Sequence, residues 1–362
     1  MMIKQKTNNY TPDFIVHPGA TLLETLGSIG MSQTELAKRI SRPEKSISEI
    51  INGGKSITPE TAIQLERAIG VPAPFWNNLE KNYQELKAKT EARSVLTEEV
   101  ELAEKYPYSE MAKNGWLQPA TKWEEKIENL LSFFAVDRLS LIDNVMPAVF
   151  RQHNGHSVSP YSIQAWLRKG LIDSHDINTQ PFDKQKLENL LSEFKSLSNE
   201  RPSVIVDRLT TSLSECGIAL VFTQDLPNTL VCGAARWITP EKAMIQLSLR
   251  GSYADIMWFT FYHELGHLLL HSKKKHFVDL TNTNNGSVEE KEANNFASEH
   301  LIPSQKLSNF VSTKEINAVS IKEFANELNM HPGIVVGRLQ HEKIIEHKEF
   351  NHLRAKYRFT NN

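Results

Sequence analysis

One strongly apolar stretch, residues 253–271, limits what this chain can fold into more than any other part of it. It reads YADIMWFTFYHELGHLLLH, and its apolar residues occupy nearly every side of a helix, which is typical of a helix buried on several faces. His263 and His267 stand four residues apart, so on a helix both imidazoles lie on one face and can bind one metal ion. Because an unpaired imidazole is costly in an apolar core, metal binding explains both histidines together.

Glu264, between the two histidines, predicts hydrolytic chemistry. A zinc ion with three protein ligands keeps a further position for water and lowers the pKa of that water to about 7. A neighbouring carboxylate can take the proton as the water attacks a carbonyl. The alternative is a buried helix that carries two histidines without a metal. We therefore expect Zn²⁺ as cofactor, with His263 and His267 as ligands and Glu264 as the catalytic base.

A third ligand has to come from another segment, and an acidic helical pattern follows at residues 288–301. It reads VEEKEANNFASEHL, in which Ala293, Phe296 and Ala297 form part of a buried stripe. Several glutamates border this stripe so closely that helical geometry does not choose between them. They are Glu289, Glu290, Glu292 and Glu299.

Three short runs before the histidine helix have the composition of strands. GIALVF at 217–222, VCGAARWI at 231–238 and AMIQLSL at 243–249 are separated by turn sequences. They predict a small β-sheet over the histidine helix. With the surrounding helical patterns, this predicts an α+β fold for residues 201–362.

The segments DIMWFTFYHELGHLLLH and EKEANNFASEHLIP, at this separation, resemble the ImmA/IrrE family of zinc metallopeptidases. The resemblance covers about residues 201–338 and implies a zincin-like peptidase domain. In that family the glutamate that opens the EAxxFA pattern completes the zinc site, and this position is Glu292 here. The resemblance therefore implies a gluzincin-like site, with His263, His267 and Glu292 as metal ligands and Glu264 as the base.

Two kinds of residue near the histidine pair are candidates for supporting roles. His271 lies one further turn along the histidine face, so it could support a ligand or the transition state. The alternative is a polar residue where the helix reaches solvent. Tyr262 and Tyr253 are weaker candidates for an oxyanion donor, since tyrosine in an apolar helix usually belongs to the core.

Residues 11–82 predict a compact all-α unit of short helices. SQTELAKRI at 32–40 opens with a capping pattern, and EKSISEII at 44–51 follows a tight turn and Pro43. Two short helices joined by a tight turn are the parts of a helix-turn-helix, whose second helix enters the major groove of DNA. A helical bundle with a solvated face is the alternative that periodicity leaves open. The candidate DNA contacts are Gln33, Arg42, Glu44, Lys45, Ser46, Ser48 and Lys55.

SQTELAKRI, RPEKSISEIINGGKSITPETAIQLERAIGV and PFWNNLEKNYQE, within residues 17–85, resemble the Xre-type helix-turn-helix domain of HigA-family antitoxins and related regulators. The resemblance covers the whole first domain. It implies sequence-specific binding to operator DNA, usually as a homodimer on a two-fold symmetric site, with 43–51 as recognition helix.

Residues 83–200 show charged helical patterns and are interpreted as a spacer or sensor region. We interpret aromatic residues at helical spacing, such as Trp123 and Trp166, as core rather than as a ligand site. Past residue 303, the patterns SIKEFANELNM and HPGIVVGRLQHEKII resemble the small C-terminal helical element common in this peptidase family. The basic tail, KEFNHLRAKYRF, is interpreted as solvated charge.

The composition limits the partners and the compartment. A chain of 362 residues predicts two or three domains, and a net charge of −2 gives no overall attraction to nucleic acid or membrane. Any DNA-binding surface must therefore be local. Cys216 and Cys232 lie in apolar runs and predict buried free thiols. No run reaches the roughly 18 apolar residues of a membrane span, and we expect a cytoplasmic protein.

Together these patterns predict a DNA-binding transcriptional regulator with zinc endopeptidase activity. By the family resemblance, its substrate is a protein, such as a helix-turn-helix repressor or antitoxin, in a stress, mobile-element or toxin-antitoxin response. Cleavage of its own chain and cleavage of a partner remain equal alternatives. The alternative from another class is a non-catalytic repressor or antitoxin of the HigA type that uses the zincin fold to sense or bind.

Overall fold

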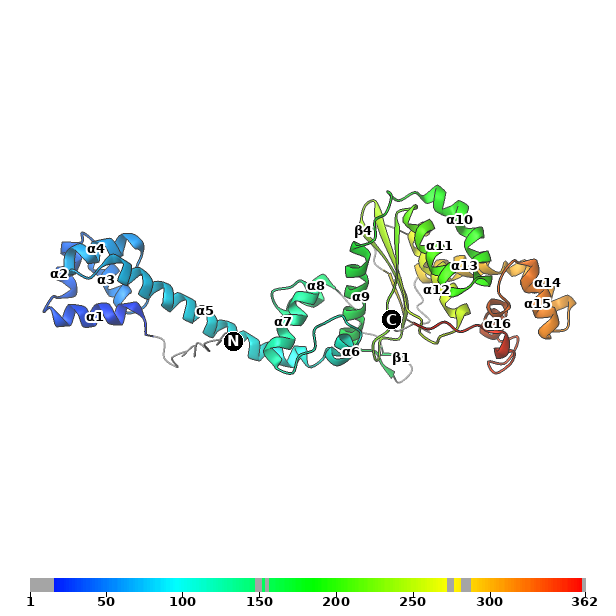
Figure 1. Cartoon of the computed structure of the whole chain (residues 1–362), viewed down its shortest axis with the longest axis horizontal. Coiled ribbons are helices and arrows are strands. Elements are labelled where there is room, and N and C mark those ends of the chain that lie inside the picture. The colour runs from blue at the N-terminus through cyan, green and yellow to red at the C-terminus, as the bar shows by residue number, and fades with distance from the viewer. Residues whose placement is uncertain (1–15, 147–151, 154–155, 272–276, 281–287, 360–362) are drawn as a thin grey trace, which may run out of the picture. The chain divides into compact units, whose positions relative to one another are not determined.

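The computed structural model describes residues 16–146, 152–153, 156–271, 277–280 and 288–359 (Figure 1). The chain forms two compact units, Met1–Glu98 and Glu99–Asn362. Residues 11–15, where the predicted first domain begins, lie outside the described residues, as do residues 281–287. The predicted domain boundaries at 82 and 200 stay predictions.

The first unit is helical, and two of its helices begin at side-chain caps of the sequence. Ser32 accepts a hydrogen bond from the Glu35 N–H, and Thr58 accepts one from the Thr61 N–H, so both cap the helices that they precede. The fifth helix is longer than the others, and its last residues belong to the second unit. The helices are α1 (Pro18–Ser28), α2 (Gln33–Arg39), α3 (Glu44–Ile51), α4 (Pro59–Ile69) and α5 (Ala73–Ala103).

The core of the first unit depends on a close approach of α1 to α3. A Cβ atom placed on Gly19 would lie 2.1 Å from the carbonyl oxygen of Ile50 and 2.6 Å from that of Ile51. Glycine at this position therefore lets the two helices pack backbone to backbone. The fully buried side chains around this contact include Leu22, Leu36, Ile47, Leu65 and Trp76.

The second unit is built on a four-stranded sheet in the order β3-β5-β4-β6. The strands are β3 (Ile218–Phe222), β4 (Val231–Thr239), β5 (Lys242–Leu247) and β6 (Phe277–Leu280). β3 runs parallel to β5, and β4 runs antiparallel to both β5 and β6. The three predicted strands are confirmed, and β6 is an additional strand beside β4. A two-stranded ladder, β1 (Gln152–His153) with β2 (His156–Ser157), lies apart from this sheet.

Helices cover both faces of the sheet. The histidine helix, α12 (Ala254–Leu270), packs against β4 and β5, whereas α9 (Pro160–His175) packs against β3 and β5 from the other side (Figure 1). Trp166 of α9 is fully buried, its indole N–H donates to the Thr223 carbonyl, and Gln246 of β5 donates to the Trp166 carbonyl at 2.7 Å. Part of the predicted spacer thus forms one layer of the second unit.

The remaining helices surround these layers. Residues of α10, α11, α12, α13, α15 and α16 share one hydrophobic core with the sheet. The helices not yet described are α6 (Tyr108–Lys113), α7 (Trp123–Phe134), η1 (Leu139–Leu141), α8 (Ile142–Val145), α10 (Lys184–Ser196), η2 (Leu197–Asn199), α11 (Pro202–Ser214), α13 (Val288–Leu301), α14 (Ser304–Thr313), α15 (Ala318–Glu327), α16 (Pro332–His341) and η3 (Asn351–Leu353).

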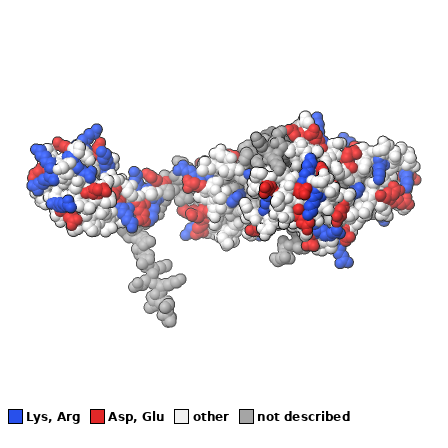
Figure 2. Space-filling model, turned by 90° about the horizontal axis from the view of Figure 1, so that it is seen from above, with Lys and Arg blue, Asp and Glu red and all other residues white. Residues whose placement is uncertain are grey.

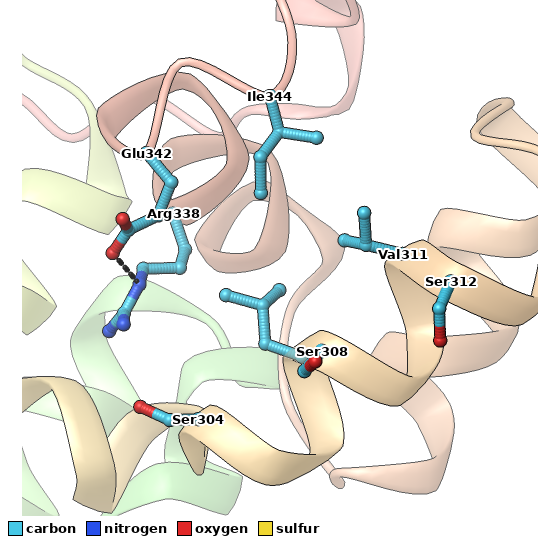
Figure 3. A pocket seen from close by; sticks show the side chains of 8 residues that line it. Ser304, Ser308, Val311, Ser312, Arg338, Glu342 and Ile344 are labelled. Carbon is cyan, nitrogen blue, oxygen red and sulfur yellow. Dashed lines mark ion pairs between the residues drawn. The ribbon is translucent and has the colours of Figure 1, made fainter.

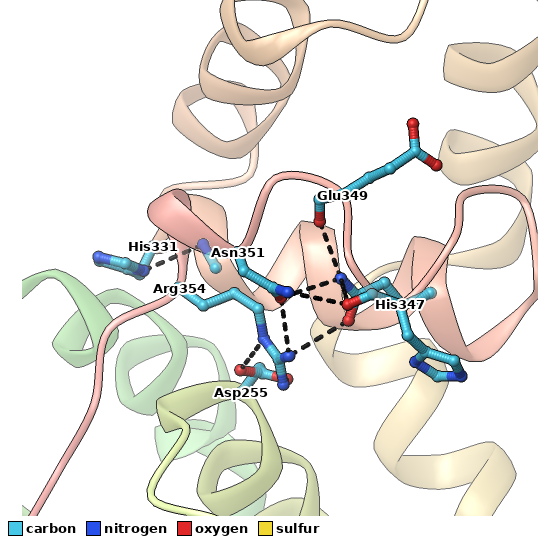
Figure 4. Close-up of polar contacts among 8 residues, drawn as sticks. Asp255, His331, His347, Glu349, Asn351 and Arg354 are labelled. Carbon is cyan, nitrogen blue, oxygen red and sulfur yellow. Dashed lines mark hydrogen bonds and ion pairs between the residues drawn. The ribbon is translucent and has the colours of Figure 1, made fainter.

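The C-terminal segment is bound to the beginning of α12. Arg354 donates from Nε and Nη2 to the two carboxylate oxygens of Asp255, at 3.0 and 2.7 Å, and from Nη1 to Gln340 and Asn351 (Figure 4). The Ala254 N–H donates to the carbonyl of Ala355. Arg354 and Asp255 are only 10% and 8% exposed. The interpretation of this tail as solvated charge is therefore wrong at Arg354, because a buried carboxylate pairs with its guanidinium.

Two further expectations concern single features of the chain. Cys216 and Cys232 are buried, and neither forms a disulfide within the described residues, as predicted. Among the helices of the described residues, none has the length and apolarity that crossing a bilayer demands.

Candidate metal centre

The three residues of the predicted catalytic motif are buried in α12. His263 and His267 are each 1% exposed, and Glu264 is fully buried. The Nε2 atoms of the two histidines lie 2.9 Å apart, so both rings point at one place between α12 and α13. The four-residue spacing on a helix therefore gives the convergence that the sequence predicts.

Glu290 on α13 completes this group. Its Oε2 lies 3.4 Å from Nε2 of His263, and its Oε1 lies 3.6 Å from Nε2 of His267. Within the described residues, His263, His267 and Glu290 form a cluster whose ligand atoms all lie within 4.8 Å of one another. Ligands at zinc-binding distance in tetrahedral geometry lie about 3.3 Å apart, so these three donors fit a zinc ion.

Glu292, the ligand that the resemblance implied, is not part of this cluster. Its side chain is 53% exposed, and its Oε2 lies 3.0 Å from Nε2 of His271. Residues two apart on a helix are separated by about 200° around its axis, and here the two glutamates meet different histidines. Glu290 lies beside His263 and His267, whereas Glu292 lies beside His271.

Glu290 lies on the face of α13 that packs against α12. Ala293 and Ala297 are fully buried, and a Cβ on Gly266 of α12 would lie 3.2 Å from the Cα of Ala293. The small residues of α13 therefore mark the face that touches α12. Glu290 precedes Ala293 by three residues and Ala297 by seven, a spacing that fits this face, but Glu289, four and eight residues before them, fits it equally.

The Nδ1 atoms of His263 and His267 also have polar partners. Nδ1 of His263 lies 3.0 Å from Oδ1 of Asn294, and Nδ1 of His267 lies 3.0 Å from Nδ1 of His271. Burial, and to a lesser extent the neighbouring histidines, lower the pKa of His267 to about 2. The ring is therefore neutral, which is the form that binds a metal ion.

A glycine in β4 leaves the space that Glu264 occupies, and sequence reasoning missed its role. A Cβ on Gly233 would lie 2.5 Å from Cγ2 of Thr260 and 2.7 Å from Oε1 of Glu264. Any other residue at 233 would thus displace the carboxylate or the helix. A glycine inside a predicted strand is the signal for such a close approach.

The two tyrosines considered as oxyanion donors have structural contacts. The Tyr262 hydroxyl donates to the Leu191 carbonyl of α10 at 2.6 Å, which uses its one proton in the core. Burial also raises the pKa of Tyr262. The ring of Tyr253 lies against the guanidinium of Arg354, 3.7 Å from its centroid. The Tyr262 hydroxyl thus donates within the core, whereas the contact of Tyr253 involves its ring.

The candidate DNA contacts lie on or beside α2 and α3 of the first unit. Lys45 and Lys55 are exposed, and Lys55 pairs with Glu49 at 2.6 Å. Nε of Arg42 donates to Gln64 of α4, so this side chain is partly committed within the unit. Glu44, also exposed, accepts a hydrogen bond from Thr34. Gln33, Ser46 and Ser48 are half-buried.

The charges of the first unit are mixed in sign. Figure 2 shows several Lys and Arg side chains on this unit with Asp and Glu side chains among them. This agrees with a chain whose net charge is −2. A DNA-binding surface here would depend on local Lys and Arg side chains rather than on a strong positive potential of the whole protein.

A hollow of about 580 Å³ lies between α14 and α16. Arg338 lies at one end near Ser304 and pairs with Glu342 at 2.9 Å (Figure 3). None of the metal-site residues lines this hollow. Its lining residues are Ser304, Leu307, Ser308, Val311, Ser312, Arg338, Glu342 and Ile344.

Two separate parts of the chain match models of known protein families. Residues 236–340 match the model of a peptidase family, M78, described as the IrrE N-terminal-like domain, and residues 24–76 match that of a helix-turn-helix family. Virulence-associated protein A of Dichelobacter nodosus is 36% identical over 69 residues, which are 18% of this chain and 68% of that protein. Virulence-associated protein I of the same organism is 33% identical over 81 residues, 22% of this chain and 75% of that protein.

Among solved structures, an addiction module antidote protein of the HigA family from Coxiella burnetii is 35% identical. The match covers 24% of this chain and 94% of that one, with a TM-score of 0.22 over the whole chain. The candidate metal centre lies within the part that matches the IrrE-like family. The chain belongs to the helix-turn-helix family through its Xre-type N-terminal domain and carries an IrrE-like domain of the M78 peptidase family at residues 236–340.

Proposed function

We propose that this chain is a zinc-dependent endopeptidase joined to a DNA-binding domain. The observation that carries the proposal is the cluster of His263, His267 and Glu290, with the buried carboxylate of Glu264 on the same helix. Two imidazoles and one carboxylate are a donor set typical of catalytic zinc in peptidases. The match of residues 236–340 to a metallopeptidase family supports the same chemistry.

In this proposal each residue of the centre has a defined task. His263, His267 and Glu290 hold the metal, which when bound supplies Lewis-acid activation of water and of a peptide carbonyl. Glu264 takes a proton from the attacking water and passes it to the leaving amine. Gly233 leaves room for the Glu264 carboxylate against β4. Glu290 thus takes the ligand role that the family resemblance gave to Glu292.

The proposed DNA-binding role rests on the helix-turn-helix match at residues 24–76. The exposed Lys45 at the start of α3 is the candidate that such a domain would bring to DNA, and Lys55 flanks the same helix. We expect the domain to bind operator DNA as a homodimer. By the family resemblance, the proposed substrate is a protein, either a helix-turn-helix repressor or antitoxin or this chain itself. Cleavage of such a protein would bring DNA binding and proteolysis to one regulatory site.

The decisive experiment compares the unaltered chain with a Glu264→Gln variant. Both proteins should contain zinc, because Glu264 is not among the proposed ligands. In cells that produce each protein, labelling of new N-termini should reveal cleavage products only with the unaltered chain. Equal sets of new N-termini, together with a lack of zinc in the purified protein, would instead favour the non-catalytic sensing module.

The DNA-binding role has an independent test. A footprint of the chain on DNA upstream of its own coding region should weaken steeply as salt rises, because phosphate contacts release counterions. Lys45→Ala should weaken this binding, whereas Lys291→Ala, an exposed change in the second unit, should not. Binding without any sequence preference would contradict the regulatory role.

A further inference from the structure

A chain of hydrogen-bonding groups leads from the candidate metal centre to the protein surface. Nδ1 of His267 lies 3.0 Å from Nδ1 of His271, and Nε2 of His271 lies 3.0 Å from Oε2 of Glu292. The His271 side chain is 5% exposed, whereas that of Glu292 is 53% exposed. The carboxylate thus sits at the rim of the site and contacts a buried ring.

We propose that His271 and Glu292 are positioning residues that hold His267 with the lone pair of its Nε2 toward the metal. This inference rests on the proposed zinc site and adds two residues to it. It also gives Glu292 a role other than that of a ligand. Neither His271 nor Glu292 touches the reacting atoms in this account, so both act through His267.

The orientation follows from counting hydrogens. An ionised carboxylate only accepts, so the Nε2 of His271 carries a hydrogen and donates it to Glu292. With the hydrogen of His271 on Nε2, its Nδ1 can accept from the Nδ1–H of His267. The remaining nitrogen of His267, its Nε2, is left with a lone pair at the place where the cluster converges, 2.9 Å from Nε2 of His263.

The other histidine is held in a parallel way by the same helix. Asn294 of α13 has its Oδ1 3.0 Å from Nδ1 of His263 and can accept a hydrogen there. Fixing the outer nitrogen of a metal-binding histidine sets its tautomer and its ring orientation. α13 therefore supplies one direct ligand, Glu290, and one supporting residue for each histidine. Asn294 contacts His263 directly, whereas Glu292 acts on His267 through His271.

The test measures the affinity of the full chain for Zn²⁺ by competition with a chromophoric chelator. Glu292→Ala should bind Zn²⁺ about 10- to 100-fold more weakly, the usual cost of losing such a support. Glu292→Gln keeps an oxygen that accepts from His271, so its affinity should return close to that of the unaltered chain. Lys291→Ala, an exposed neighbour on the same helix, is the matched control and should change nothing.

A double-mutant cycle tests whether the two residues act in series. His271→Ala should weaken Zn²⁺ binding about as much as Glu292→Ala, and the double variant should lose little more than either single variant. Thermal unfolding of the metal-free proteins shows whether each variant is folded. Because Glu292 is half exposed, its variants should unfold at the temperature of the unaltered chain.

Three outcomes would overturn the inference. Equal Zn²⁺ affinity in Glu292→Ala and Lys291→Ala would show that Glu292 gives no support. Complete loss of binding in Glu292→Ala, with binding retained in Glu290→Ala, would make Glu292 a ligand instead. Failure of the unaltered, folded chain to bind Zn²⁺ would overturn the proposed function itself, and this inference with it.

Discussion

Asp255, in the first turn of the helix that carries the metal-binding motif, is held through both carboxylate oxygens by Arg354, 99 residues later in the chain. Both side chains are almost fully buried. Gly337 of α16 makes this approach possible, because a Cβ there would lie 2.4 Å from Oδ2 of Asp255. The beginning of α12 is therefore fixed by a segment that the sequence pattern did not connect with it.

Arg354→Met should lower the free energy of unfolding of the second unit by about 3–5 kcal/mol, because it leaves the Asp255 carboxylate buried without its partner. Urea unfolding followed by circular dichroism measures this change. The matched control is Lys348→Met, which breaks an ion pair with Glu346 in which both side chains are exposed. That variant should lose no more than about 1 kcal/mol. Equal losses of unfolding free energy in the two variants would show that the buried ion pair stabilises the protein no more than the exposed one.

Gly19→Ala should destabilise the first unit, since the added methyl group would meet the backbone of α3, which has no way to move aside. We expect a loss of about 1–3 kcal/mol. Gly27, in the same helix, has no atom within 4 Å of the position that a Cβ would take, so Gly27→Ala is the matched control. It should be neutral or slightly stabilising, because alanine favours helix. Thermal unfolding with equal midpoints for both variants would contradict the close contact of α1 with α3.

Gly233→Ala should disturb the proposed base without removing any proposed ligand. The new methyl group would meet Thr260 and Glu264, so the carboxylate has to move or β4 has to shift. Proteolytic activity should fall more steeply than Zn²⁺ affinity. Measuring both in the same preparation separates this outcome from general unfolding. Unchanged cleavage would show that Glu264 does not need its present position.

Stability should depend on His331 when the pH falls below about 6.5. Burial lowers the pKa of His331 from its ordinary value of 6.5, so the unfolded chain binds a proton more readily than the folded one. The contribution of the neutral ring is therefore complete above pH 6.5 and is lost as the pH falls toward the lowered pKa. Its Nδ1 also accepts from the Gly333 N–H at the start of α16, and a proton there would break this cap.

His331→Asn tests this prediction, because asparagine also caps helices but does not titrate. The stability of the unaltered chain relative to the variant should fall between pH 7.5 and pH 5, in urea unfolding at several pH values. Taking the difference removes the titration of all other histidines. A difference that stays constant over this range would contradict the assignment.

Much of this architecture follows from local patterns in the sequence. Ser32 caps the helix that it was expected to begin, and the apolar pattern around residues 253–271 does mark a buried helix. The predicted α+β class is confirmed, with three strands where three were expected. These features depend on neighbours within a few residues, which the sequence displays directly.

The features that the sequence did not predict depend on contacts between distant segments. Glu290 rather than Glu292 lies beside His263 and His267, and this depends on the angle at which α13 packs against α12. The sequence does not show that angle, because both glutamates border the same apolar stripe. The packing of Trp166 against the sheet and the pairing of Arg354 with Asp255 join residues that are 57 to 99 positions apart. No periodicity carries that information.

The bond between Arg354 and Asp255 also bears on how the protein is made. A nascent chain that has emerged as far as α13 already contains His263, His267 and Glu290, but it lacks the cation that neutralises Asp255. The first turn of α12 would therefore lack the partner of its buried carboxylate until residue 354 has left the ribosome. Synthesis of the C-terminal segment would thus set the moment at which the start of this helix is fixed.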